Sequence, residues 1–305
     1  MLMPSECGCG TPRAMLFSED ADKKAIDDLN RQVKSQRPPL SQLTRAKRDQ
    51  LIAEVSAERS FERALGSARQ ELSDLLELAL SSNDPSLLLS LDDQQLSDFI
   101  LQGGMGLAVE DFVGSQERIR EAALKGLQLV NPDLTADGLP ELDSIQAQLV
   151  SQVFDDVILP DTKKAIRGAL TSIALDVPDE IIMSDLNRAL SSSTGRQLTE
   201  VKTAISQYGR SITAAAAAAA ELDHYLYTGP LDGITRPFCK VLVNKVVTSS
   251  QMRELRNGQG LAVITSGGGY NCRHSWSPVT DSFVEAADLE RATASDIRRA
   301  NARGR

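Results

Sequence analysis

Apolar residues recur at alternating steps of three and four positions between Leu198 and Leu226, and this repeat restricts the fold more than any other feature. It holds for about four heptads, and residues 191–228 contain no proline. Such spacing places every member on one side of an α-helix, as in a coiled-coil seam. A run of alanines from Ala214 to Ala220 adds the residue with the highest helix propensity. We therefore predict a helix of about 30 residues, roughly 45 Å long.

The seam could pack within one chain or between copies of it, because spacing alone does not separate these arrangements. Its members are Leu198, Val201, Ile205, Tyr208, Ile212, Ala215, Ala219, Leu222 and Leu226.

Shorter stripes of the same kind occupy most of the first 225 residues, with prolines mainly between them. The clearest runs from Phe61 to Ala79. We predict a mainly α protein whose body is a long helical bundle or resembles a coiled coil. The expected parts are a flexible N-terminus (1–20), the helical domain (21–228), a small α+β module containing Cys and His (229–284) and a basic tail helix (285–305).

Charge limits the classes of partner. With 33 basic and 42 acidic residues the net charge is −9, which argues against a general nucleic-acid-binding surface. The tail is the exception, since it carries five arginines, among them Arg298 and Arg299, against two acids after Leu289. It is either a solvated helix end or a docking tail for an acidic protein or DNA.

The beginning of the sequence has no pattern of a secretory signal, and the longest run of small apolar residues is far shorter than the roughly 20 residues of a membrane span. We expect no membrane association and a reducing cytoplasm during synthesis. The four cysteines are then free thiols or metal ligands more readily than disulfides.

Residues after Tyr227 alternate between short β-branched runs and turns. Residues 239–247 (CKVLVNKVV) and 261–264 (LAVI) predict buried strands. Residues 249–258 (SSQMRELRNG) predict a short helix with a serine cap, and residues 265–271 (TSGGGYN) a tight connection. These patterns indicate a compact unit of about 55 residues.

Thiol and imidazole side chains within this unit are candidate zinc ligands. Cys272 and His274 stand two positions apart, so in an extended segment they share a face. Cys239 could reach them, and Asp232 is a candidate fourth ligand. A structural zinc would stabilise so small a unit decisively, but packing on the helical domain could do the same. Buried free cysteines and a disulfide therefore remain alternatives, and the absence of a CxxC pair weakens the prediction of a metal site.

Sequence signatures of enzymes are missing. There is no Walker A loop, no HExxH and no GxSxG. A catalytic pair of Cys272 and His274 would need a group that orients the base, and none is evident. We predict a protein that is not an enzyme.

Three segments of the C-terminal unit, DGITRPFC, KVVTSSQMREL and GGGYNCRHSWSPV, together resemble the terminal module of minor head (head-morphogenesis) proteins of tailed bacteriophages, the group related to the F protein of phage Mu. The likeness covers about 55 of 305 residues. It departs from the family at Leu242, where many relatives have a second cysteine, and at His274, where a cysteine often stands. The matching residues are Asp232, Thr235, Cys239, Asn271, Cys272, Arg273, His274, Trp276, Pro278 and Val279.

The resemblance implies a virion component of modest copy number that contacts portal, capsid or neck proteins and is present in the host cytoplasm during assembly. It implies action through protein–protein contacts, and the seam adds association between copies as an option. Two other readings are kept open: a metal-dependent hydrolase or toxin-like effector carried by the particle, and a bacterial coiled-coil adaptor unrelated to phage.

Overall fold

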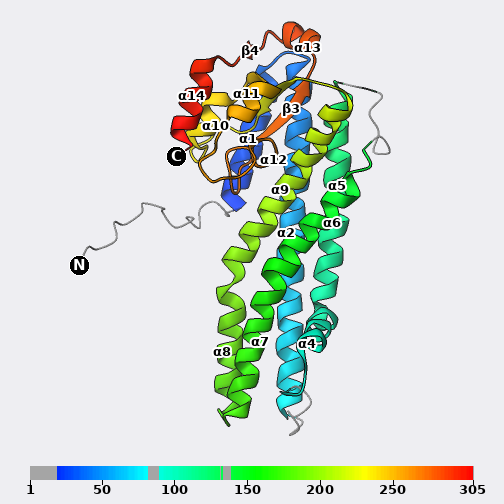
Figure 1. Ribbon diagram of the computed structural model, residues 1–305, viewed down its shortest axis with the longest axis vertical. Helices are drawn as coiled ribbons and strands as arrows, with labels where there is room; N and C mark the ends of the chain where they lie inside the picture. Colours follow the sequence, from blue (N-terminus) through cyan, green and yellow to red (C-terminus); the bar gives the residue numbers. More distant parts are fainter. Residues whose placement is uncertain (1–18, 82–88, 131, 133–138, 305) are drawn as a thin grey trace, which may run out of the picture.

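The computed structural model describes residues 19–81, 89–130, 132 and 139–304 and shows a rod-like helical body with a small mixed α/β unit at one end (Figure 1). The prediction of a mainly α protein with a small C-terminal α+β module is confirmed. The flexible terminus predicted for residues 1–20 lies outside the described residues, except that Glu19 and Asp20 begin the first helix.

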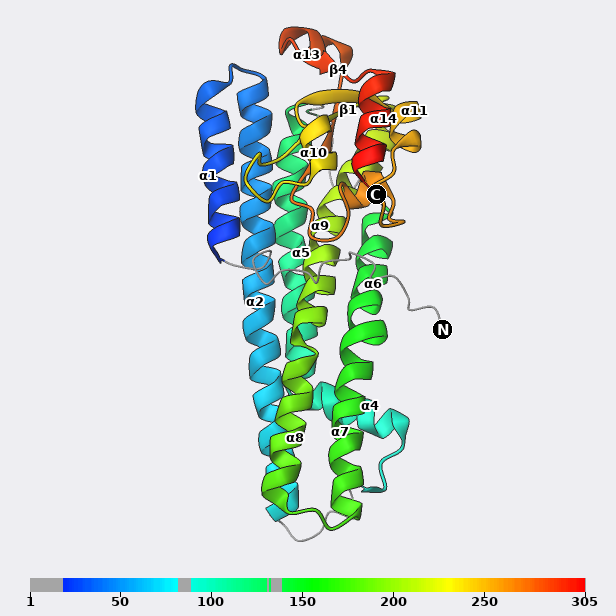
Figure 2. The ribbon, with the colours of Figure 1, turned by 90° about the vertical axis from the view of Figure 1, so that its left-hand side faces the viewer.

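Four long rods run side by side in the body, and a further helix, α1, lies along the first of them (Figure 2). The third rod is continued through a five-residue π-helical turn, the second is kinked at Leu101–Met105, where Gly103 and Gly104 have non-helical backbone angles, and the fourth consists of two helices joined at Ser193. The helices are α1 (Glu19–Ser35), α2 (Leu40–Ser81), α4 (Asp93–Ile100) with α5 (Gly106–Gln128), α6 (Leu142–Val153) with α7 (Leu159–Ala174), and α8 (Asp179–Ser192) with α9 (Thr194–Ala219).

The π-helical turn and the kink each have a local cause. In the third rod the turn Phe154–Ile158 lies just before Pro160, which has no N–H and whose ring would clash with the carbonyl of residue 156 in a regular helix. In the second rod the turn Leu101–Met105 contains Gly104 at φ +91°. This left-handed residue sets α4 at an angle to α5 (Figure 1).

Replacing Gly104 with alanine is expected to destabilise the protein by about 1–3 kcal/mol, because a side chain at positive φ is strained. A Cβ there would also lie 3.1 Å from the Cα of Ala68. Gly114, in α5, is a matched control, since a Cβ at that position meets nothing within 4 Å. Gly114→Ala should stabilise by roughly 0.5–1 kcal/mol. Urea unfolding followed by circular dichroism measures both, and equal effects would contradict this account of the kink.

The core of the body combines aromatic rings from three rods with the seam of the fourth. Phe61, Phe112 and Phe154 meet edge to face, with ring centroids 5.7–5.8 Å apart. The central residues of the α9 seam, from Val201 to Ile212, are buried against this core. The seam therefore packs within the chain.

The predicted long helix is wrong at its C-terminal end. Helix α9 stops at Ala219, and the backbone reverses at Glu221, whose φ is +52°. The amide of Leu222 closes the turn by donating to the carbonyl of Ala217 at 2.9 Å. The following residues, expected to be helical, form strand β1 (His224–Thr228), so Leu226 is buried in a sheet rather than on the seam.

The mixed unit is built on a four-stranded sheet with the order β3-β1-β2-β4, in which β1 pairs antiparallel with β2 and β3, and β2 pairs parallel with β4. Edge strand β3 contains Pro278, and β4 has only two residues. Since β1 and β4 belong to the sheet, the unit extends beyond residues 229–284 at both ends. The strands are β1 (His224–Thr228), β2 (Lys245–Thr248), β3 (Ser275–Val279) and β4 (Glu290–Arg291), and the helices are α10 (Pro237–Leu242), α11 (Ser249–Glu254), α12 (Val263–Ser266), α13 (Asp281–Ala286) and α14 (Ala294–Arg303).

Two predicted strands are corrected. Residues 239–242 belong to helix α10, which begins at Pro237, a residue whose fixed φ favours the first helical turn. Residues 263 and 264 begin helix α12, which packs against α9. The helix predicted over 249–258 is present only as the shorter α11, which ends at Glu254, and its cap is Thr248. Among the described residues, no helix has both the length and the apolar character needed to cross a membrane.

Helix α14 begins with a reciprocal cap in which the carboxylate of Asp296 accepts from the backbone amide of Thr293 at 3.0 Å. That hydrogen bond, helped by Lys245 at 3.1 Å, lowers the pKa of Asp296 from 3.8 to about 2. A lowered folded-state pKa means that the stabilisation is complete above about pH 4 and is lost between about pH 4 and pH 2.

Asp296→Asn should therefore lower the free energy of unfolding by about 1 kcal/mol at neutral pH. The difference from the wild type should shrink as the pH falls towards 2, which urea unfolding at several pH values measures. A difference that stays constant from neutral to acid pH would show that the carboxylate charge is not its source.

Candidate metal centre

A cluster of two thiols and one imidazole lies at the centre of the mixed unit. Cys239 is on α10, while Cys272 and His274 lie in the extended segment that leads into β3. All three side chains are buried, with exposed fractions of 1%, 4% and 2%. Their candidate ligand atoms all lie within 4.8 Å of one another. The structure thus brings together three of the four ligands predicted from the sequence.

The tight connection before β3 positions Cys272. It reverses the chain with positive φ at Gly267, Gly269 and Asn271, residue types that adopt this conformation at low cost. Gly268 passes so close to the cluster that a Cβ there would lie 2.5 Å from the sulfur of Cys239. Its amide donates to the sulfur of Cys272 at 3.1 Å. The GGG sequence therefore lets the backbone approach both sulfurs.

Distances within the cluster are short. The sulfurs of Cys239 and Cys272 are 3.8 Å apart, and the Nδ1 atom of His274 is 3.8 Å from the sulfur of Cys272. The hydroxyl of Tyr227, from strand β1, lies 3.4 Å from the first sulfur and 3.6 Å from the second. The Tyr227 ring also stacks on the His274 imidazole, with centroids 5.3 Å apart. The cluster consequently has four polar side chains, one of which the sequence reasoning missed.

A buried arginine from the bundle supports the segment that carries two of the ligands. Arg210, on α9, is 3% exposed. Its guanidinium donates to the carbonyls of His274 at 2.9 Å and Thr265 at 3.1 Å, and also to the carbonyl of Cys272. Arg210 thus connects the long helix to the segment that carries Cys272 and His274, a role that no sequence pattern indicated.

The charges around the cluster favour a thiolate on Cys272. The hydrogen bond from Cys239, together with the imidazole of His274, lowers the pKa of the Cys272 thiol well below its ordinary value despite burial. The same hydrogen bond and burial raise the pKa of Cys239. Burial and the two neighbouring sulfurs raise the pKa of Tyr227. Thiolate and neutral imidazole are the forms that bind zinc.

One buried atom of the cluster is unpaired. The Nε2 atom of His274 has no hydrogen-bond partner among the described residues. A buried polar atom without a partner costs free energy, and Nε2 is on the side of the ring away from Nδ1, the atom that approaches the sulfur of Cys272. An ion bound by Nδ1 would leave Nε2 unpaired. The donor set of two sulfurs and one nitrogen nevertheless suits a zinc ion. Buried free thiols held by hydrogen bonds are the alternative reading of the same distances.

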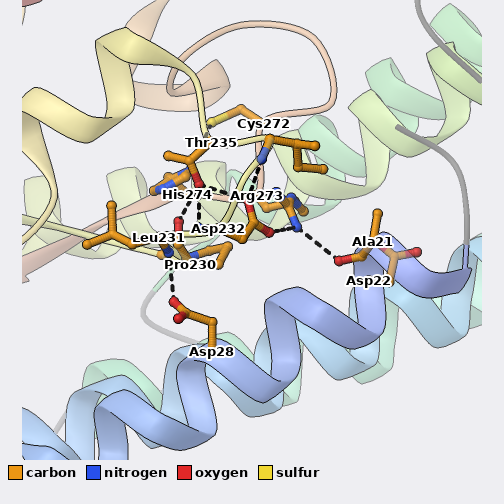
Figure 3. A network of polar contacts seen from close by, with 12 residues as sticks. Ala21, Asp22, Asp28, Pro230, Leu231, Asp232, Thr235, Cys272, Arg273 and His274 are labelled. Carbon is orange, nitrogen blue, oxygen red and sulfur yellow. Dashed lines mark hydrogen bonds and ion pairs between the residues drawn. The ribbon is translucent and has the colours of Figure 1, made fainter. Parts of the chain in front are cut away.

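Asp232, the fourth ligand predicted from the sequence, lies outside the cluster and has other partners (Figure 3). Its carboxylate forms an ion pair with Arg273 at 2.6 Å and accepts a hydrogen bond from the hydroxyl of Thr235 at 2.9 Å. Although burial opposes it, the bond from Arg273 lowers the pKa of Asp232. The carboxylate is thus held as a charged partner of the arginine.

The same network attaches helix α1 to the mixed unit (Figure 3). Arg273 donates to the carbonyl of Ala21 at 3.1 Å, and Asp28 accepts from the amide of Leu231 at 2.7 Å. The segment that carries Cys272 and His274 is therefore attached to two helices of the bundle, to α9 through Arg210 and to α1 through Arg273.

The residues predicted to mediate interactions differ in exposure and lie on two helices and the turn after α9. Most of the α9 seam is buried in this chain, whereas Ala219 is exposed and Leu222 lies half-buried in the turn after α9. Arg298 and Arg299 are exposed on α14, and Arg299 pairs with Asp296 at 2.6 Å.

Comparison of the chain with protein-family models, with curated proteins and with solved structures gave no match.

Proposed function

We propose that this protein is a structural component of a tailed-bacteriophage particle, associated with the portal, capsid or neck, and that it acts through protein–protein contacts. The observation that carries the proposal is the placement of the residues that resemble the minor head family. Most of them are buried, and four, Cys239, Cys272, His274 and Trp276, lie together at the centre of the mixed unit. A motif used in this way serves to build a rigid unit.

Within this proposal, the cluster of Cys239, Cys272 and His274 holds a structural zinc ion. The ion would join α10 to the segment before β3, which are 33 residues apart in the chain. Structural zinc contributes about 10–16 kcal/mol of apparent binding free energy in small domains, far more than the hydrogen bonds that it replaces. The mixed unit would then keep its shape while it is carried at the end of a long rod.

Burial counts against the hydrolase or toxin reading. A catalytic zinc needs an open coordination position that substrate and water can reach. Here the candidate ligands are at most 4% exposed, and Gly268 and Tyr227 cover the sulfurs. A coiled-coil adaptor unrelated to phage is also disfavoured by the seam, most of which is buried within the chain.

Mass spectrometry of purified particles tests the virion assignment. Particles from the host that carries this gene would be purified by density gradient, and peptides of this chain would be quantified against the major capsid protein. We expect a constant ratio well below one through successive purification steps. A chain that stays in the supernatant while capsid protein sediments would overturn the proposal.

A further inference from the structure

We infer that Tyr227 is the fourth metal ligand, so that the site is a closed tetrahedron of two sulfurs, one nitrogen and the phenolic oxygen. The inference rests on the proposed zinc site and adds to it the residue that completes coordination. It replaces Asp232, whose carboxylate is held by Arg273.

The evidence is the set of distances between the donor atoms. With Zn–S bonds of about 2.3 Å and Zn–N and Zn–O bonds of about 2.0 Å, a tetrahedral site has donors about 3.8 Å apart for two sulfurs, about 3.6 Å for sulfur and nitrogen and about 3.5 Å for sulfur and oxygen. The measured separations are 3.8 Å between the sulfurs and 3.8 Å from Cys272 to His274. Those from the Tyr227 hydroxyl to the two sulfurs are 3.4 and 3.6 Å.

These four separations, out of the six edges of a tetrahedron, agree with the expected values to within about 0.2 Å, and the ligand atoms of His274 and Cys239 lie within 4.8 Å of each other. They involve side chains from three separate segments, α10, β1 and the segment before β3. Tyr227 is fully buried between the rings of His274 and Trp276, with ring centroids 5.3 and 4.2 Å away. Its hydroxyl is therefore held beside both sulfurs.

Charge balance also suits four donors. When a divalent ion binds, each thiol that is still protonated and the Tyr227 phenol release their protons to solvent as the metal bonds form. Two thiolates and one phenolate around a divalent ion leave one negative charge. The guanidinium of Arg210, bonded to the carbonyls beside two of the ligands, supplies a positive charge nearby. The amide of Gly268 donates to the sulfur of Cys272, a contact that stabilises a metal-bound thiolate.

Zinc titration of the full chain tests the inference, with Tyr227→Phe as the variant and Tyr225→Phe as the matched control. Tyr225 lies on the same strand and is similarly buried, at 7% exposure, but is not among the partners of the sulfurs. Addition of zinc to the wild type should produce the near-ultraviolet difference absorption of a tyrosinate. Tyr225→Phe should keep this band, whereas Tyr227→Phe should lose it and bind zinc at least tenfold more weakly.

The possible outcomes distinguish failure of this inference from failure of the proposals on which it rests. If the wild type binds one zinc without a tyrosinate band, or if Tyr227→Phe binds zinc as tightly as the wild type, Tyr227 is not a ligand but the zinc site stands. If the wild type binds no zinc, the metal site itself is overturned. Because the band is measured on the wild type, the test holds even if Tyr227→Phe folds poorly. The virion assignment is tested independently by the particle experiment.

Discussion

His274→Ala is expected to abolish zinc binding and to unfold the mixed unit while the helical body stays folded. The substitution removes one ligand of the proposed zinc site, whose ion would contribute on the order of 10 kcal/mol to a small unit. It also leaves a cavity beneath the ring of Tyr227, which stacks on the imidazole. The variant should therefore melt as the wild type does after zinc has been removed by a chelator.

The chain offers separate probes for its two parts. Trp276, its only tryptophan, is buried in the mixed unit, so its fluorescence reports on that unit. Far-ultraviolet circular dichroism is dominated by the long helices of the body. Melts followed by both signals, with zinc content measured on the same samples, should show a lower transition in fluorescence alone.

His224→Ala is the matched control, since His224 is the other histidine of the chain and lies at the surface of β1 beside Asp281. It should keep zinc and melt like the wild type. A His274→Ala protein that folds normally but loses an enzymatic activity would favour the hydrolase reading. One that keeps its zinc would overturn the assignment of the ligands.

Arg210→Met is expected to destabilise the mixed unit by roughly 3 kcal/mol or more, because three buried carbonyls lose their donor. Methionine fills much of the space of the aliphatic stem but leaves the carbonyls of Thr265, Cys272 and His274 without their donor. Each buried unpaired acceptor costs about 1–3 kcal/mol. In urea, the fluorescence transition should move to lower concentration and separate from that of the bundle.

Two further variants serve as references for the size of this effect. Arg299→Met removes an exposed arginine whose ion pair with Asp296 lies at the surface, and it should cost at most about 1 kcal/mol. Arg210→Lys keeps the charge but lacks the planar fork, so it should fall between the wild type and Arg210→Met. Equal stability of all three variants would show that Arg210 does not support the ligand segment.

Much of the body could be predicted because its helices are long and their apolar spacing is regular. Most of the stripe from Phe61 and most of the α9 seam lie in the core, but Leu75 is exposed, Leu76 is buried in its place, and Ala219 is exposed. The error at the end of α9 has a physical reason. Leu222 and Leu226 continue the spacing by coincidence, because a buried strand also needs apolar residues, and the chain reverses at Glu221 without a glycine or proline to mark the turn.

The site was predictable only in part for the same reason. Cys239, Cys272 and His274 are scarce residue types close to one another in a short unit, so their juxtaposition could be expected from composition. Tyr227 could not be predicted as part of the site because it lies in a segment predicted to be the end of the long helix. In a helix its hydroxyl would not face the sulfurs. Short apolar segments such as 239–242 and 261–264 are compatible with a strand or a helix. Residues 239–242 are helical where α10 packs against α14, and residues 263 and 264 are helical where α12 packs against α9.

The two edges of the sheet have a consequence for self-assembly. At one edge Pro278 has no N–H to offer to an incoming strand, and at the other β4 ends after two residues. Growth of the sheet by strand addition from a neighbouring copy is thus obstructed on both sides. A contact between copies would therefore have to use a surface other than these two strand edges.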